Sequence, residues 1–279
     1  IVVLTSYVFN NVRLLLLSGL GRPYDPNTGK GVIGKNYAYQ VLRGNAVGFF
    51  EDREFNLFAG AGSLGACLDD YNGDNFDHSD LNFIHGGNIR IAQTGLRPIA
   101  NNKVPKGTPS WGKEYKAATL KYYYRTLSIG AEGASMPFRH HFLDLDPTYK
   151  DVFGDPLMRI TFDFEEQDRQ LAAHVAERAG EILREMGANT VEVNGKLGPY
   201  DITPYQSTHN TGGVIMGASP DTSAVNNYLQ MWDVENLFVI GASAFPHNSG
   251  YNPTGTVGAL AYRAAEGIVK YSKSGGLLV

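Results

Sequence analysis

The chain has 279 residues, 43% of them hydrophobic and 19% charged, which is the composition of a globular protein with a substantial core. With 24 Lys and Arg against 28 Asp and Glu, the formal net charge is −4, which argues against nucleic acid or an anionic membrane surface as the main partner. The single cysteine excludes an intramolecular disulfide, and no apolar run approaches the roughly 20 residues that span a bilayer.

The first 18 residues predict a buried β-strand and then a short apolar helix around Val12 to Ser18. The chain begins without Met, inside this strand, and carries no signal peptide. We therefore expect it to be the C-terminal part of a longer protein. A surface loop rich in Gly, Pro and Asn follows at 19–36, and residues 38–58 contain short β-like stretches.

Residues 60–115 are polar, rich in Gly and Asn, and without clear periodicity, which predicts a long functional loop such as a lid. Strands are predicted at 120–136 and 157–164. The clearest helix lies within 164–188, with Gly187 at its end. Its apolar residues recur at helical spacing: Leu171, Val175, Ala179, Ile182, Leu183 and Met186. Further strands are predicted at 189–194 and 236–245, before an amphipathic helix that opens at 252–254.

Gly60, Gly62 and Gly65 have the G-x-G-x-x-G spacing of dinucleotide-binding loops. That fingerprint requires a strand before the glycines and a helix after them, because the helix N-terminus holds the pyrophosphate. Here the segment DDYNGDN at 69–75 cannot continue a helix, and its first two residues would bring carboxylates close to the phosphates. We conclude that these glycines do not bind a nucleotide.

Two further patterns in this region are weak. Ser63 lies in a near match to the G-x-S-x-G elbow of serine hydrolases, but Ala61 replaces the first glycine. A hydrolase that uses Ser63 and His209 stays open as an alternative of another class. The acidic segment 69–80 lacks the spacing of an EF-hand, so we interpret it as an Asx-rich loop and expect no metal site.

The chemistry is concentrated in the segments 207–217 and 235–268. In the second segment a buried strand ends at Gly241 and Ala242, where small residues let a ligand approach the backbone. The helix that opens after Asn252 has free N–H groups and a positive dipole end, which suit an anionic group. In the first segment His209 lies among glycines and uncharged residues, as catalytic imidazoles often do, although a single histidine is also compatible with a structural role.

Together these segments resemble the C-terminal part of the glucose-methanol-choline (GMC) flavoprotein oxidoreductases. That family has a His-x-x-Gly stretch, a later strand with a Gly-Asp or Gly-Ala turn, and a His or Asn that opens the last helix. The matching positions are His209 with Gly212, then Gly241 with Ala242, then Asn252. The stretches FNNVRLLLLSGLG and GVIGKN resemble a second family signature, whereas LTSYVFNN lacks its usual glycine-alanine pair. The spelling of STHNTGG, FVIGASAFP and GYNPTGTVGALAY is most similar to flavoprotein subunits of the gluconate 2-dehydrogenase type.

The resemblance implies an α/β fold in which a substrate domain with a mostly antiparallel sheet is joined to the C-terminal part of a Rossmann-like FAD domain. It places part of the FAD domain at 1–36, the substrate-binding domain at 37–205 with the long loop at 60–115, and the catalytic segment with the last strand and helix at 206–279. The glycines that hold the ADP part of FAD would precede residue 1.

The implied activity is FAD-dependent oxidation of an alcohol group of a sugar acid or sugar, with hydride passing from the substrate carbon to flavin N5. His209 would be the general base, since an imidazole ordinarily titrates near neutral pH, and Asn252 would hydrogen-bond to the substrate oxygen. Gly241 and Ala242 would contact the cofactor through their backbone. Asn252, Pro253 and Thr254 would place a helix N-terminus near the flavin.

Some alternatives remain open. The same family contains aldose and alcohol dehydrogenases and oxidases, and the fragment could also be a non-catalytic binding module. A sugar-acid carboxylate needs a cation, for which Arg90, Arg139, His140 and His141 are candidates, although a surface or structural role suits them equally. By resemblance, the whole enzyme would be periplasmic and would pass electrons to a membrane-bound cytochrome c subunit, with a small accessory subunit.

Overall fold

The computed structural model describes residues 1–41, 44–56, 65–91, 103–203 and 208–278. The chain forms two compact units, and it passes between them several times. The first unit is made of 1–40, 135–163 and 199–279, and the second of 41–134 and 164–198. Each unit is therefore assembled from segments that are far apart in the sequence.

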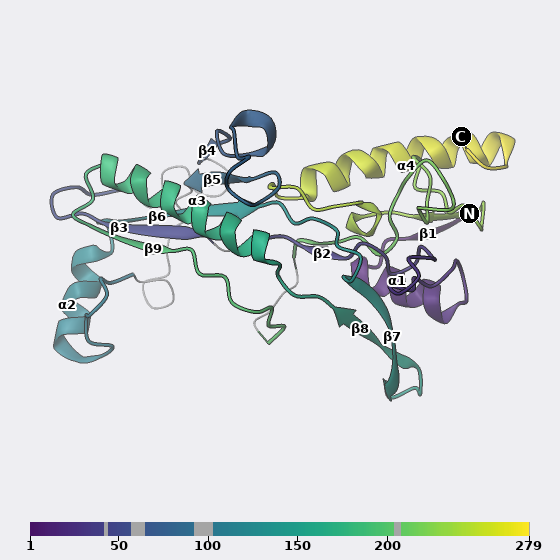
Figure 1. Cartoon of the computed structure of the whole chain (residues 1–279), viewed down its shortest axis with the longest axis horizontal. Helices are drawn as coiled ribbons and strands as arrows, with labels where there is room; N and C mark the ends of the chain where they lie inside the picture. Colours follow the sequence, from purple (N-terminus) through teal and green to yellow (C-terminus); the bar gives the residue numbers. More distant parts are fainter. Residues whose placement is uncertain (42–43, 57–64, 92–102, 204–207, 279) are drawn as a thin grey trace. The chain divides into compact units, whose positions relative to one another are not determined.

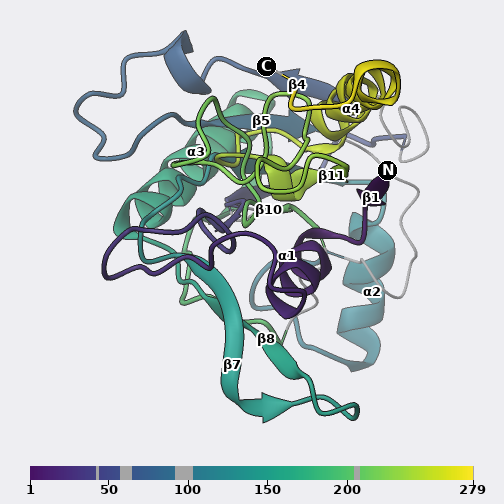
Figure 2. The same ribbon diagram turned by 90° about the vertical axis from the view of Figure 1, so that its right-hand side faces the viewer.

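The first unit is built from small sheets and two helices of ten residues or more. Its parallel pair joins β1 (Val2–Leu4) to β11 (Leu237–Val239), with Val3 opposite Phe238. An antiparallel pair joins β2 (Ala38–Tyr39) to β10 (Asn210–Thr211). The remaining elements are α1 (Val8–Leu17), β7 (Phe142–Lys150), β8 (Pro156–Thr161), a 3-10 turn at Ala242–Ala244 and α4 (Thr254–Ser274). The hairpin of β7 and β8 projects from the rest of this unit in both views (Figures 1 and 2).

The second unit contains a five-stranded sheet in the order β4-β5-β6-β3-β9, and all of its neighbouring strands are antiparallel. The strands are β3 (Asn45–Phe49), β4 (Ala66–Leu68), β5 (Gly87–Ile91), β6 (Thr126–Gly133) and β9 (Thr190–Asn194). The helical elements are a 3-10 turn at Gly73–Asn75, α2 (Gly112–Tyr122) and α3 (Glu166–Glu185). A mixed α/β fold with a mostly antiparallel sheet is thus confirmed.

The core of the second unit forms where α3 packs against β3 and β6 (Figure 1). The apolar stripe that predicted the helix is buried at four positions, Leu171, Val175, Ala179 and Leu183, whereas Ile182 and Met186 are partly buried at its margin. Helix α3 ends at Glu185, and its C-cap residue Met186 is followed by Gly187, whose φ of 84° favours glycine. The predicted helix and its end are confirmed.

Several predicted elements differ from the structure. The first strand is not buried, since Val2 is 51% and Val3 43% exposed, because β11 is its only neighbour among the described strands. The first helix begins at Val8 rather than Val12. Residues 120–122 belong to α2 and not to a strand, because the preceding Lys- and Ala-rich turns favour a helix. The region 60–115 contains β4 and β5, so it is not a continuous loop.

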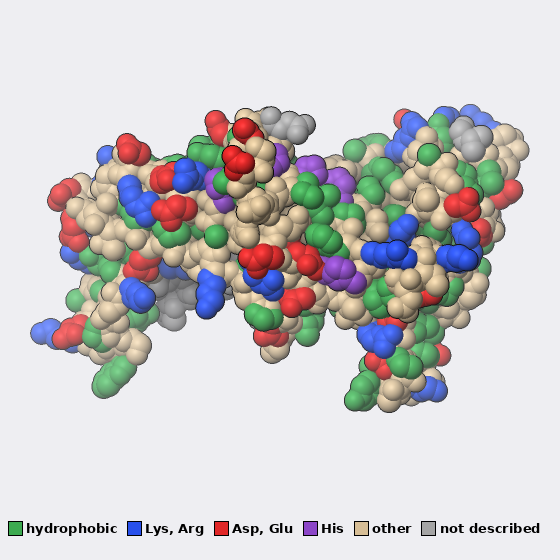
Figure 3. Space-filling view, viewed as in Figure 1, with side chains coloured by type: hydrophobic (Ala, Val, Ile, Leu, Met, Phe, Trp, Pro, Cys, Tyr) green, Lys and Arg blue, Asp and Glu red, His purple; other side chains and the backbone are tan. Residues whose placement is uncertain are grey.

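The surface carries charges of both signs. Acidic and basic side chains are interspersed on the face shown in Figure 3, which agrees with the small net charge. Within the described residues, no helix has the length and apolar character needed to cross a membrane.

The start of α3 provides a pH-sensitive carboxyl group. Asp168 is only 1% exposed, and its Oδ2 accepts a hydrogen bond of 2.9 Å from the backbone N–H of Glu165, as part of a capping box. Burial disfavours the charged form and raises the pKa of Asp168 from 3.8 to about 6. Between about pH 4 and pH 6, the Asp168 carboxyl group therefore keeps its proton in the folded protein but has lost it in the unfolded chain.

We expect the free energy of unfolding to fall as the pH rises from about 4 to about 6, and this contribution to become constant above that. Replacing Asp168 by Asn should remove a pH-dependent difference on the order of 2–3 kcal/mol, because the amide does not titrate. Urea unfolding of both proteins across this pH range measures the difference. Parallel pH curves for the two proteins would show that Asp168 does not titrate as stated.

Candidate active site

A cavity of about 320 Å³ lies in the first unit, beyond the carboxyl ends of the parallel strands β1 and β11. Such strand ends are where α/β folds place their ligands. Four segments form its walls. They are the β1–α1 connection with the first turn of α1, the start of β10 with the residues before it, the turn after β11, and the start of α4. The lining residues are Thr5, Tyr7, Val8, Asn11, Thr208, His209, Asn210, Ile240, Gly241, Ala242, Pro253, Thr254 and Val257.

Glycines allow these segments to approach one another. Gly212 has a φ of 84°, and a Cβ at this position would lie 1.9 Å from the carbonyl oxygen of Asn36. Its N–H donates to the carbonyl oxygen of Ala242 at 3.0 Å, so β10 is connected to the turn after β11. Gly241 has a φ of 124° and open space around its missing Cβ. Only glycine adopts such conformations readily, which explains the glycines of both sequence motifs.

His209 lies directly before β10 with a φ of 61°, a left-handed conformation in which His is enriched. Two hydrogen bonds to its carbonyl oxygen hold this backbone, one from Asn248 Nδ2 at 2.7 Å and one from the N–H of Gln40 at 3.3 Å. His209 lines the cavity, and its ring Nδ1 hydrogen-bonds to Oε1 of Gln40. The histidine is therefore fixed at both its backbone and its ring.

The cavity wall beside the histidine is polar and uncharged. Asn210 donates from Nδ2 to the hydroxyl of Tyr7 at 2.6 Å and accepts from the hydroxyl of Tyr37 at 2.6 Å. Burial raises the pKa of Tyr37 well above its usual value, so this donor remains neutral. Asn11 Nδ2 donates to Ser243 Oγ at 3.0 Å. Among the described lining residues there is no Asp, Glu, Lys or Arg.

The amino end of α4 completes the cavity. The helix begins at Thr254 with Pro253 as its N-cap residue, and no side chain caps it. The backbone bond from Val257 N–H to the carbonyl of Pro253, at 2.9 Å, belongs to its first turn. The N–H groups before this position have no partner within the helix, and they give this end a partial positive charge. An anionic group would be stabilised here.

The structure brings five of the six site residues predicted from the sequence to one cavity, namely His209, Gly241, Ala242, Pro253 and Thr254. Asn252 directly precedes Pro253 and is exposed, but it does not belong to the lining residues. Gly60, Gly62 and Ser63, the residue that the hydrolase alternative requires, lie outside the described residues.

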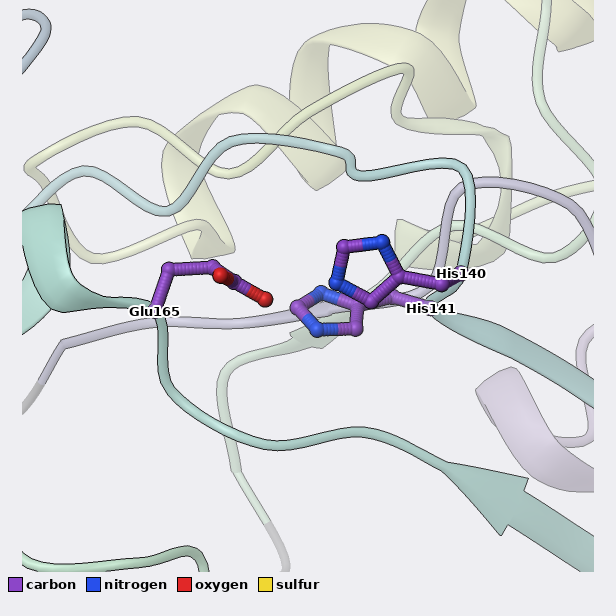
Figure 4. Close-up of side chains that lie close together, drawn as sticks. All are labelled: His140, His141 and Glu165. Carbon is purple, nitrogen blue, oxygen red and sulfur yellow. The ribbon is translucent and has the colours of Figure 1, made fainter.

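The candidate cations for a carboxylate do not line this cavity. Arg139 donates to the carbonyl oxygens of Pro26 and Asn27 at 3.1 and 3.3 Å. His140 is exposed and His141 buried; their rings meet edge to face with centroids 4.5 Å apart (Figure 4).

The remaining candidate cation, Arg90, and the carboxylate Glu165 both belong to the second unit. Glu165, also labelled in Figure 4, caps α3 there. Arg90 forms an ion pair with Glu132. Both therefore have a structural role that needs no ligand.

Sequence reasoning missed Gln40 and Asn248. Gln40 directly follows β2 and is 0% exposed, although its side chain is polar. A polar residue inside the run NYAYQVL was the available signal, because buried amides are retained when they are hydrogen-bonded. Asn248 gave no comparable signal, since its surroundings PHNSG read as an ordinary loop.

Comparison with known proteins identifies the class. Residues 137–261 match the family model described as GMC oxidoreductase. The gluconate 2-dehydrogenase flavoprotein of Pantoea cypripedii is 46% identical, over 100% of this chain and 46% of that protein. The 2-methyl-1,2-propanediol dehydrogenase of Mycolicibacterium austroafricanum is 30% identical over 95% of this chain and 47% of its own length. The chain belongs to the GMC oxidoreductase family, and it spans about half the length of these curated relatives.

Two other proteins complete the comparison. The fructose dehydrogenase large subunit of Gluconobacter japonicus is 26% identical over 94% of this chain and 46% of that subunit. Among solved structures, a formate oxidase from Aspergillus oryzae superposes with a TM-score of 0.56 at 16% identity, over 96% of this chain and 54% of that one. At this identity the superposition supports the fold alone.

Proposed function

We propose that this chain forms the substrate side and part of the FAD site of an enzyme that oxidises an alcohol group of a sugar acid, with gluconate as the first substrate to test. The observation that carries the proposal is the convergence of His209, the Gly241–Ala242 turn and the uncapped start of α4 on one uncharged cavity. The gluconate 2-dehydrogenase flavoprotein at 46% identity supports the choice of substrate.

The residues around the cavity fit FAD. Open space at the missing Cβ of Gly241 allows a cofactor to approach the backbone, and Ala242 adds little bulk. The positive end of α4, at Pro253 and Thr254, suits negative charge on a phosphate or on a reduced ring. No carboxylate among the described lining residues opposes such charge. When bound, FAD supplies the acceptor of the substrate hydride.

The chain itself contributes proton transfer and orientation. His209 accepts the proton of the substrate hydroxyl, and Asn252 donates a hydrogen bond to the same oxygen, so that the carbon to be oxidised is held in one orientation. The neutral wall formed by Asn210 and Tyr7, with Tyr37 donating to Asn210 from behind it, positions the substrate without competing for that proton. Each role assigned here is a proposal about a named side chain and can be tested by its replacement.

The relatives also support a second set of substrates within the same chemistry. Their names include a diol dehydrogenase and a fructose dehydrogenase, so a sugar or a simple alcohol is the runner-up. Because one of them is named a large subunit, we further propose an assembly with a cytochrome c subunit and a small accessory subunit. We propose a periplasmic location for that assembly.

The test is an anaerobic visible spectrum of the protein, expressed from its whole coding sequence, before and after addition of D-gluconate. We expect flavin absorption bands that bleach with gluconate. Bleaching with only fructose, glucose or a simple alcohol would replace the substrate and keep the class of reaction. A purified, folded protein that holds no flavin would overturn the proposed function.

A further inference from the structure

Gln40 connects His209, the proposed general base, to the loop that precedes α4. The antiparallel pairing of β2 with β10 places Tyr39 opposite Asn210, so Gln40 lies beside His209. Its side chain is fully buried. Its Nε2 donates to the carbonyl oxygen of Ser249 at 2.6 Å and to that of Tyr251 at 3.0 Å, while its Oε1 meets His209 Nδ1.

These contacts determine which way the amide points. An amide NH₂ has two hydrogens, and both are used by carbonyl oxygens, which only accept. Turning the amide over would place its oxygen against those two carbonyl oxygens and its NH₂ against the histidine. The network therefore assigns Oε1 to the histidine.

The orientation of the amide determines the protonation of the ring. Since Oε1 can only accept, the hydrogen on the neutral imidazole must be on Nδ1. The Nε2 lone pair is then the one that accepts a proton. A ring that carried its hydrogen on Nε2 would place two lone pairs against each other at Gln40, inside a buried site.

We propose that Gln40 is a positioning residue that holds His209 as the Nδ1–H tautomer with Nε2 as its basic nitrogen, and that it joins this base to the loop bearing Asn252. The inference rests on the proposed function for its consequence in catalysis, but the tautomer itself is a property of the protein without substrate. Gln40 acts through His209 and is not assigned any contact with substrate or cofactor.

Three variants separate positioning from packing. Gln40→Met keeps the length of the side chain and removes both the acceptor and the donors. Gln40→Glu keeps an oxygen that accepts from Nδ1 but loses the donor pair to Ser249 and Tyr251. The matched control is Gln230→Met: Gln230 is also fully buried, donates to the carbonyl oxygens of Glu235 and Gly276, and accepts through Oε1 from Asn226, but its hydrogen bonds do not involve His209.

The direct readout is the tautomer of His209. Long-range proton–nitrogen NMR of protein labelled with ¹⁵N at histidine distinguishes the two tautomers, and the signal that disappears in His209→Ala identifies the residue among the seven histidines of this chain. We expect the Nδ1–H form in the wild type and in Gln230→Met, and a mixture of both forms in Gln40→Met. The Nε2–H form in the wild-type protein would overturn the proposal.

The second readout is the rate of flavin bleaching as a function of pH. In Gln40→Met we expect the maximal rate to fall about 10- to 100-fold, with flavin content unchanged. In Gln40→Glu we expect recovery of most of this rate, with the acidic limb of the pH profile, where the base becomes protonated, moved to higher pH by about one unit, because a carboxylate favours the protonated imidazole. If Gln40 only held the loop, Glu would be at least as harmful as Met, because its carboxylate opposes two carbonyl oxygens.

The outcomes distinguish this inference from the proposed function. A wild type that shows the Nδ1–H form but does not bleach with gluconate or any other alcohol would leave the positioning intact and remove the activity. A wild type that bleaches while Gln40→Met keeps the same tautomer, rate and pH profile would remove the positioning and leave the activity.

Discussion

Replacing His209 by Ala is expected to slow the gluconate-dependent bleaching of the flavin about a thousandfold, because the substrate hydroxyl loses the group that takes its proton. The residual rate should depend on the buffer, since an external base can partly substitute in the space that the imidazole leaves. Stopped-flow absorbance under anaerobic conditions measures this rate, and the flavin spectrum of the resting protein measures cofactor content.

A matched replacement shows whether the effect is specific. His78→Ala also removes an imidazole, but one that stacks on Phe83 in the second unit and does not line the cavity. It should bleach at close to the wild-type rate. If His209→Ala retains its flavin and bleaches as fast as His78→Ala, then His209 is not the base and the assignment is wrong.

Replacing Gly212 by Ala is expected to lower the free energy of unfolding by at least about 1–3 kcal/mol from the left-handed backbone conformation alone. The close approach of a Cβ to the carbonyl oxygen of Asn36, at 1.9 Å, should add to this. Because His209 directly precedes β10, and Gly212 directly after β10 is hydrogen-bonded to Ala242, the cavity should also be distorted. Urea unfolding measures the loss of stability.

Gly130→Ala serves as the control for this prediction. Gly130 lies in β6, and a Cβ there would meet nothing within 4 Å. We expect a change in the free energy of unfolding below about 1 kcal/mol. Equal stability for the Gly212 and Gly130 variants would mean that β10 does not approach Asn36 as closely as described.

The periodic spacing of apolar residues predicts the long elements that bury one face, such as α3, but not the short strands. Helix α3 was predicted because its apolar residues repeat with the period of a helix, and it is bounded by a cap and a glycine. The short strands β4 and β5 were missed because three to five residues give too little alternation to distinguish a strand from a polar loop. The Tyr-rich stretch after Leu120 was assigned to a strand on side-chain type, although the preceding helix extends into it.

The candidate site was predictable where one short segment carries the signal. Gly241, Ala242, Pro253 and Thr254 are close in sequence, and the strand–turn–helix pattern predicts that they are close in space. His209 could be singled out by its surroundings, but not its partner, since Gln40 is 169 residues away. No local sequence pattern predicts that His209 and Gln40 lie side by side. Their contact depends on the pairing register of β2 with β10, and each of these strands has only two residues.

The contacts that hold His209, in its left-handed backbone conformation, to Gln40 and Asn248 bear on the stage of folding at which activity can arise. Its backbone and ring are held by residues 40 and 248, and the segment after it is hydrogen-bonded at Gly212 to Ala242, so the proposed base is oriented only after segments from both ends of the chain have met. Closing loops of this length is among the slower and entropically costlier events of folding. Catalytic competence should therefore be a late product of folding, and the tautomer of one imidazole a sensitive reporter that the native topology is complete.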